Sequence, residues 1–142
     1  EKFIIEGFSR GGFFALSYAI DHPEQIEKIY LDAPVCDLES WPSKRDEKLY
    51  RDAERRWAEG GGDLKEGHDY PIRHFEQIRK AGIPLIVCYG AADELVPYAE
   101  NFGRIATVRH RPMRIIRKAD CGHHPHSLEQ PRKIVRFLKR RR

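Results

Sequence analysis

Residues 1–12 read EKFIIEGFSRGG, and this stretch decides the fold. The apolar run at 2–6 is typical of a short buried strand. The motif Gly-Phe-Ser-Arg-Gly follows directly at 7–11, and residues 11–20 predict a helix that is apolar on most sides. A strand, a Gly-x-Ser-x-Gly turn and a helix form the context in which a serine is presented as a nucleophile. The sequence therefore raises the question of whether Ser9 is catalytic or only begins a helix.

The residues around Ser9 fit the catalytic interpretation. Gly7 and Gly11 lie two positions before and after the serine, where we expect the backbone to pack too closely for a side chain. The start of a helix directs backbone N–H groups at one point, so the Arg10 N–H is a candidate donor to an oxyanion. We therefore predict a strained turn with Ser9 at its tip.

A serine nucleophile needs a histidine base and an acid that orients the histidine. A predicted strand at 84–89 is followed by GAADELVP, which contains Asp93. A predicted strand at 114–117 is followed by KADCGHH, which contains His123. The carboxyl ends of parallel strands meet at one edge of a sheet, so three separate loops can bring these residue types together. The chain order serine, acid, histidine is the order known for this arrangement.

The rest of the chain alternates strands with helices, which indicates an α/β class with a parallel sheet of about four strands. The remaining predicted strand lies at 27–31. Further helices are expected at 44–59, 72–81, 97–108 and 129–140, the last with Ile134, Val135, Phe137 and Leu138 facing inward. Trp41-Pro42 and the glycines at 60–62 mark residues 36–80 as a segment of different character.

Composition narrows the functional classes. The chain has 142 residues, 40% of them hydrophobic and 34% charged, which suits one globular domain. Residues 132–142 hold seven bases and no acid, so the net charge of +4 comes from one terminal helix and predicts no nucleic-acid partner. No apolar run is long enough to span a membrane. Three cysteines without CxxC spacing predict neither a disulfide framework nor a structural zinc site, and Cys88 reads as a core residue.

The segments GFSRGG, GAADELVP and CGHHPHSLEQP resemble the nucleophile, acid and histidine segments of the α/β-hydrolase superfamily. The resemblance implies a partial α/β-hydrolase fold: residues 1–142 would be its C-terminal half, with 36–80 as a helical cap-like insertion and the first strands outside the chain. SRGG, DAPVCDLESWP and GHHPHSL resemble, more closely, a bacterial group of prolyl-oligopeptidase-like α/β-hydrolases.

This resemblance implies a serine hydrolase that acts through Ser9, His123 and Asp93, and it does not supply a substrate. We expect a small-molecule carboxylic ester as the substrate, with no cofactor and no metal. A peptidase of the prolyl-oligopeptidase type and a non-catalytic α/β module remain alternatives. The second oxyanion donor would come from an earlier strand. A missing N-terminal segment or a second copy of the chain would then complete the sheet. There is no secretory signal at residue 1, which favours the cytoplasm without fixing the compartment.

Some assignments keep competitors. Asp32 ends the strand at 27–31 and is an alternative acid, since some superfamily members carry the acid there, and Asp93 could simply form a turn. His123 follows a glycine, as the base does in the family pattern, and is preferred over His124. A cluster of potential ligands follows the predicted strand at 114–117 and could also suggest a metal site, although no second cluster of ligands accompanies it. Its members are Asp120, Cys121, His123, His124 and His126.

Overall fold

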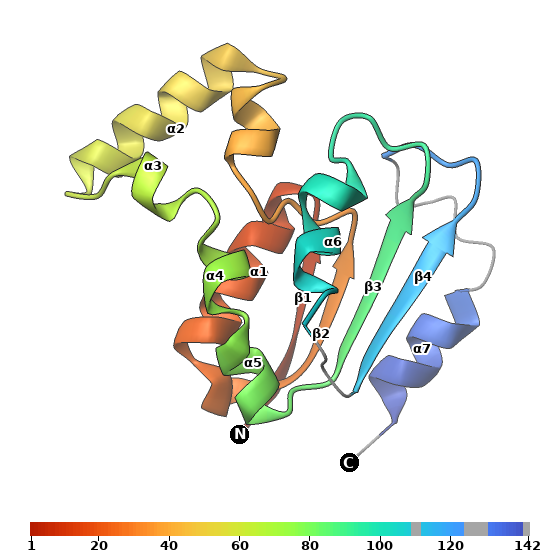
Figure 1. Cartoon of the computed structure of the whole chain (residues 1–142). Coiled ribbons are helices and arrows are strands. Elements are labelled where there is room, and N and C mark those ends of the chain that lie inside the picture. The colour runs from red at the N-terminus through yellow and green to blue at the C-terminus, as the bar shows by residue number, and fades with distance from the viewer. Residues whose placement is uncertain (109–111, 124–130, 141–142) are drawn as a thin grey trace.

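Four parallel strands, separated along the chain by helices, form the sheet that the sequence predicts (Figure 1). The computed structural model describes residues 1–108, 112–123 and 131–140. The strands pair in the order β1-β2-β3-β4, each with its neighbour in sequence. They are β1 (Phe3–Phe8), β2 (Ile26–Asp32), β3 (Leu85–Gly90) and β4 (Met113–Lys118).

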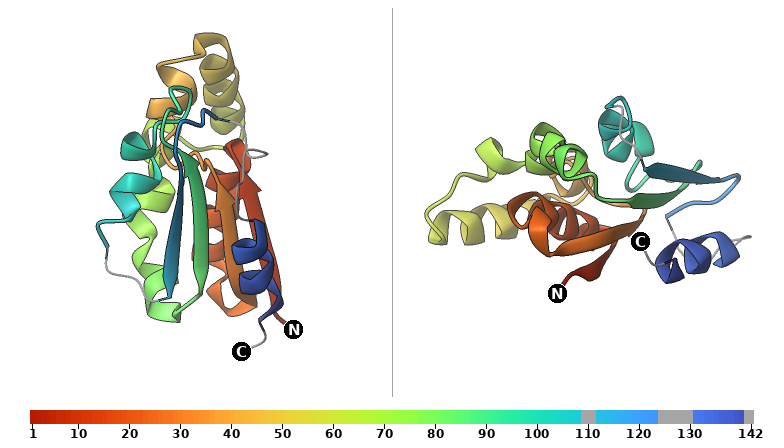
Figure 2. Two further views of the ribbon diagram at one scale, coloured as in Figure 1. Left: turned by 90° about the vertical axis from the view of Figure 1, so that its right-hand side faces the viewer. Right: turned by 90° about the horizontal axis from the view of Figure 1, so that it is seen from below.

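Helices cover both faces of the sheet, because successive side chains of a strand point to opposite faces. One face is buried under α1 (Arg10–Asp21), α5 (Glu76–Ala81) and α6 (Phe102–Ile105). The strand residues in that layer include Ile29, Leu31, Leu85 and Val87. The other face is covered by α7 (Pro131–Lys139) (Figure 2). Its Ile134 packs against Tyr30, Ile86 and Cys88. The core position expected for Cys88 is confirmed.

Three expectations about helices need correction. The helix expected at 72–81 is interrupted at Phe75 and divides into α4 (Tyr70–His74) and α5. The helix expected at 97–108 is reduced to η3 (Tyr98–Glu100) and the short α6. Asn101 separates these two with a non-helical backbone (φ −117°, ψ −109°). In α7, Ile134 is buried but Val135 is 46% exposed, so the inward position expected for Val135 is wrong.

The segment between β2 and α4 stands beyond the carboxyl ends of the strands, on the side of β1 and α1 (Figure 1). It contains η2 (Glu39–Ser43), α2 (Glu47–Glu59) and α3 (Leu64–Gly67). The side chain of Asp46 caps α2 by accepting a hydrogen bond from Leu49 N at 3.0 Å. No residue of α2 is fully buried, but its partly buried Leu49 and Trp57 pack against the cluster of Phe13, Val35, Trp41 and Val96.

Trp57 supplies the closest of these contacts. A Cβ at Gly62 would lie 2.5 Å from Trp57 Cδ1, and a Cβ at Gly67 would lie 3.1 Å from Trp57 Cζ2. The indole therefore packs directly against backbone that only glycine provides. The Phe13 ring of α1 meets the same indole edge-on, at 6.5 Å between ring centroids. In the described part of the chain, no helix has both the length and the apolarity to cross a membrane.

Candidate active site

Ser9 lies at the sharp turn between β1 and α1. Its backbone has φ 50° and ψ −119°, a left-handed conformation that is costly for a residue with a side chain. The turn is held from the loop after β2, because Ser9 N donates to Asp32 O at 3.0 Å and Val35 N donates to Ser9 O at 2.9 Å. The backbone of two neighbouring strand ends therefore fixes the strained conformation.

The glycines around Ser9 do not share one role. A Cβ at Gly7 would lie 2.7 Å from Gly11 O and 2.8 Å from Gly12 Cα, so the close approach expected at Gly7 is present. Around Gly11 there is open space, and the same expectation is wrong there. Gly12 carries the constraint instead, since its Cβ would lie 2.3 Å from Pro34 Cβ. The motif spacing misses Gly12 because its neighbour comes from another strand end.

The structure brings Ser9, His123 and Asp93 together in one chain of hydrogen bonds. His123 Nε2 lies 2.8 Å from Ser9 Oγ, and His123 Nδ1 lies 2.8 Å from Asp93 Oδ2. The Asp93 carboxylate can only accept, so the imidazole proton is on Nδ1 and Nε2 accepts from the Ser9 hydroxyl. The Asp93 side chain is 1% exposed and that of His123 is 20% exposed, which leaves the histidine open to a small molecule.

Asp93 also forms the turn that the sequence offered as its alternative role. Its Oδ1 accepts hydrogen bonds from Leu95 N at 3.0 Å and from Val96 N at 2.9 Å. Its other carboxylate oxygen, Oδ2, is the one that contacts His123 Nδ1. The two roles are thus compatible, because the turn fixes the carboxylate in the orientation that the histidine requires.

Gly90, at the end of β3, allows the histidine loop to lie over the acid loop. A Cβ there would fall 2.1 Å from Gly122 O and 2.4 Å from Cys121 O. The two loops are tied by Ala91 N to Lys118 O and by Ala92 N to Cys121 O, both at 2.9 Å. Sequence reasoning did not single out Gly90, although a glycine at the end of a strand is a signal of close backbone approach.

Asp32, the alternative acid, pairs with a lysine instead. It is 1% exposed, and its Oδ1 lies 3.0 Å from Nζ of the buried Lys118. Burial raises the pKa of the Asp32 carboxyl, against the opposing effect of Lys118. Of the two candidate acids, the structure places Asp93 on His123. The other histidine candidate, His124, lies outside the described residues, as does His126.

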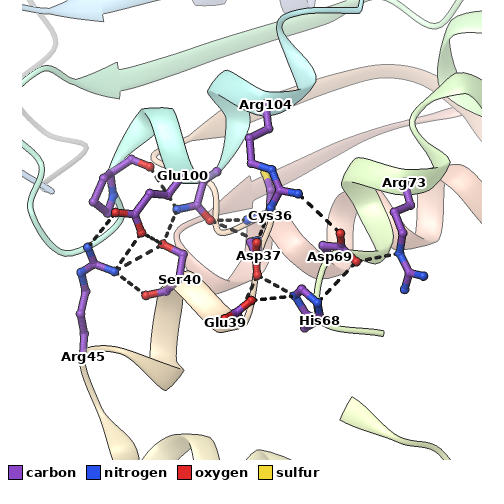
Figure 3. A network of polar contacts seen from close by, with 12 residues as sticks. Cys36, Asp37, Glu39, Ser40, Arg45, His68, Asp69, Arg73, Glu100 and Arg104 are labelled. Carbon is purple, nitrogen blue, oxygen red and sulfur yellow. Dashed lines mark hydrogen bonds and ion pairs between the residues drawn. The ribbon is translucent and has the colours of Figure 1, made fainter. Parts of the chain in front are cut away.

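A polar network joins the loop after β2 to the acid loop (Figure 3). The buried Asn101 accepts hydrogen bonds at Oδ1 from Cys36 N at 2.8 Å and from Asp37 N at 3.1 Å. Its Nδ2 donates to Ser40 Oγ at 3.2 Å and to Pro97 O at 3.1 Å. One side chain therefore satisfies four polar groups from two loops, which explains why the helix breaks at Asn101.

Arg45 extends the same connection. Its Nε donates to Glu94 O at 2.9 Å, next to Asp93, and its guanidinium also bonds Ser40 and Glu100 (Figure 3). The hydrogen bonds from Ser40 and Arg45 lower the pKa of the Glu100 carboxyl. The segment that leads into α2 is therefore fastened to the loop that carries Asp93.

Asp37, Glu39 and His68 are the group of potential metal ligands found among the described residues, with ligand atoms within 4.8 Å of one another. Arg104 bonds Asp37 Oδ2, and His68 Nδ1 lies 2.9 Å from Asp37 Oδ1 (Figure 3). These contacts balance the carboxylate charge within the protein, so the group reads as a structural ion-pair cluster. Asp120, Cys121 and His123 form no such group in the described part of the chain.

A cavity of about 720 Å³ lies between the start of α1, η2 and α2. Arg10, the residue after Ser9, lines it together with the tryptophans Trp41 and Trp57. Trp41 is almost fully buried and packs with Phe13, Val35 and Val96. The cavity therefore borders the serine turn on the side of the segment that contains α2.

The chain resembles known proteins in both sequence and fold. The sequence model of the prolyl oligopeptidase family matches residues 1–141. No curated protein matches the chain. Among solved structures, the Paleococcus ferrophilus monoacylglycerol lipase has a TM-score of 0.68 at 17% identity, covering 97% of this chain and 68% of the lipase.

Two further structures show the same architecture. The esterase domain from a Rhodothermus marinus protein has a TM-score of 0.58 at 16% identity, with 93% of this chain and 57% of that chain covered. The mouse alpha/beta hydrolase domain-containing protein 10 has a TM-score of 0.58 at 17% identity, with coverages of 95% and 60%. At these identities the likeness establishes the fold: part of an α/β-hydrolase domain, spanning between 57% and 68% of these three chains.

Proposed function

The chain belongs to the prolyl oligopeptidase family, and from this membership we propose that it is a serine hydrolase that cleaves carboxylic esters. The observation that carries the proposal is the chain of contacts from Ser9 Oγ through the His123 imidazole to Asp93, at 2.8 Å on both sides of the ring. The hydrolase fold and the strained conformation of Ser9 support the same conclusion.

In the first step, Ser9 Oγ attacks the ester carbonyl carbon while its proton passes to His123 Nε2. Asp93 stabilises the imidazolium that forms, because its carboxylate accepts from Nδ1 and is itself oriented by two backbone N–H groups. The first N–H groups of a helix have no intrahelical acceptor, so the Arg10 N–H is free to donate to the oxyanion. The carbon–oxygen bond to the alcohol then breaks, and the alcohol takes the proton from Nε2.

In the second step, water replaces the alcohol. His123 Nε2 takes a proton from the water, the resulting hydroxide oxygen bonds the acyl carbon, and the bond to Ser9 Oγ breaks as the serine regains its proton. The products are a carboxylic acid and the free enzyme. The three side chains supply all the proton transfers of the cycle.

The proposal is tested by the turnover of para-nitrophenyl acetate. Ser9→Ala should lower kcat by about 10⁴-fold or more, because the covalent step is lost. Ser17→Ala is a matched control, since Ser17 Oγ donates to Phe13 O within α1 and lies outside the proposed machinery. An unchanged circular dichroism spectrum would show that the fold is intact. A Ser9→Ala variant that keeps most of the activity would contradict the assignment.

A serine peptidase is the second candidate, favoured by the family to which the chain belongs. The same side chains can attack an amide, so the substrate must decide between the two. A prolyl para-nitroanilide and para-nitrophenyl acetate should therefore be compared at equal enzyme concentration. Cleavage of the ester alone supports the esterase, and a higher kcat/KM for the anilide supports the peptidase. A protein that cleaves neither substrate would favour a non-catalytic module.

A further inference from the structure

The cavity lined by Arg10, the residue after Ser9, has the size and lining of a ligand site. Its volume of about 720 Å³ falls within the range of small-molecule pockets. Four aromatic side chains contribute to its walls: Phe13, Phe14, Trp41 and Trp57. Phe14 is 66% exposed, a high value for a phenylalanine, and it lies on the cavity wall, where it offers apolar surface to a ligand.

The walls are fixed before any ligand arrives. Trp57 is held against the backbone of Gly62 and Gly67, and its ring meets Phe13 edge-on. Trp41 belongs to a buried cluster with Phe13 and Val96. Aromatic surfaces held in this way bind apolar groups with little loss of side-chain entropy.

The residues that line the cavity carry more positive than negative charge. Two arginines, Arg10 and Arg56, and one acidic residue, Asp52, are among the residues that line it. Asp52 already pairs with Arg55 at 3.1 Å. Within the residues that the structure describes, neither Arg10 nor Arg56 forms an ion pair. Two such arginines on the wall of one largely aromatic cavity are complementary to an apolar ligand that carries a negative charge.

The position of the cavity indicates which part of an ester it receives. The leaving alcohol must be near His123, because that residue protonates it. Arg10, whose N–H is the proposed oxyanion donor, lines the cavity, whereas neither Ser9 nor His123 is among the lining residues. The acyl side of the ester therefore points toward the cavity and the alcohol points away from it.

We propose that this cavity binds the acyl group of the substrate, and that the acyl group is an extended apolar chain ending in an anionic group held by Arg56 and Arg10. This inference rests on the proposed function, since it assigns the substrate class of the same site. It makes the protein a hydrolase of half-esters of dicarboxylic acids, or of acyl groups with the same combination of apolar chain and terminal charge.

Two para-nitrophenyl esters of equal chain length test the proposal: the hexanoate and the mono-ester of adipic acid. The wild-type protein should show a kcat/KM for the adipate at least about tenfold higher, as expected for a hydrogen bond to a charged group. Arg56→Gln should remove most of that preference, because the kcat/KM for the adipate ester falls toward that for the hexanoate. Arg51→Gln is the control, because Arg51 lies on the same helix, pairs with Glu47 and does not line the cavity.

Phosphonylation separates this inference from the proposed function. An alkyl fluorophosphonate with a hexyl chain and one whose chain of equal length ends in a carboxylate both place that chain on the acyl side. Faster labelling of Ser9 by the carboxylate probe, lost in Arg56→Gln, supports the inference. Equal labelling rates for the two probes, or an equal loss of preference in Arg51→Gln, would overturn this inference. In that case Ser9 would still be the nucleophile of the proposed function. No labelling of Ser9 by either probe overturns the proposed function itself.

Discussion

At the serine turn, the neighbouring glycines 11 and 12 have opposite surroundings. Gly11 has no atom within 4 Å of a built Cβ, whereas Gly12 lies against Pro34. Gly11→Ala should therefore raise the free energy of unfolding by about 0.5–1 kcal/mol, since alanine favours the helix. Gly12→Ala should lower it by about 1–3 kcal/mol, because the helix must move away from the loop after β2.

Urea denaturation of the two variants measures both effects. An equal loss of stability in the two would contradict the steric difference. The Gly-x-Ser-x-Gly spacing predicts the strained turn at Ser9 and the close approach at Gly7, because these constraints come from the strand, turn and helix themselves. It does not identify Gly12 or Gly90, whose close neighbours come from loops that follow other strands. Such contacts depend on the whole sheet and leave no local pattern.

At the level of elements, Asn101 joins the loop after β2 to the acid loop. Asn101→Ala should lower the free energy of unfolding by about 2–4 kcal/mol, because the N–H groups of Cys36 and Asp37 lose their acceptor. Asn101→Asp keeps this acceptor but loses the donation to Ser40 and Pro97. Thermal unfolding of both variants should therefore rank them with alanine as the less stable.

The opposite ranking would show that the two donated hydrogen bonds, or the new charge, affect the free energy of unfolding more than the two accepted hydrogen bonds do.

Asn101 also explains one limit of prediction from sequence. Residues 97–108 have a helical pattern, but the side chain of Asn101 bonds backbone 65 residues away and takes its own backbone out of the helix. Local propensity carries no information about that partner.

At the level of the whole molecule, the reactivity of the three cysteines measures how well the two helix layers bury the faces of the sheet. Cys36 is buried in the layer under α1, Cys88 is buried in the layer under α7, and Cys121 is partly exposed. Burial raises the pKa of the Cys36 thiol and raises that of Cys88 to about 12. In native buffer a disulfide reagent should therefore react with Cys121 at least about 10²-fold faster than with the other two.

Thiol titration with and without denaturant checks this order, and Cys121→Ser should remove the fast reaction. Two fast-reacting thiols in the native protein would contradict the described core.

The raised pKa of Cys88 also makes the free energy of unfolding depend on pH. Between its ordinary value of 9.0 and about 12, the unfolded chain releases a proton that the folded chain keeps. The free energy of unfolding should thus fall as pH rises through that window.

The alternation of strands and helices was enough to predict the parallel sheet and the edge where three loops meet. Ser9, Asp93 and His123 could be named from the sequence because each follows a strand, and parallel strands end together. The cavity could not be predicted, since it depends on how α2 lies against α1. That arrangement depends on the contact between Trp57 of α2 and Phe13 of α1, which local periodicity does not predict.

The most direct test of the central claim is to map the adduct of a fluorophosphonate probe by mass spectrometry of peptides. We predict a single modified residue, Ser9, and labelling that falls by about 10²-fold or more in His123→Ala, because the base is lost. Ser17→Ala should label as the wild type does. An adduct on another serine, or equal labelling of Ser9 with and without His123, would contradict the claim that these side chains act together.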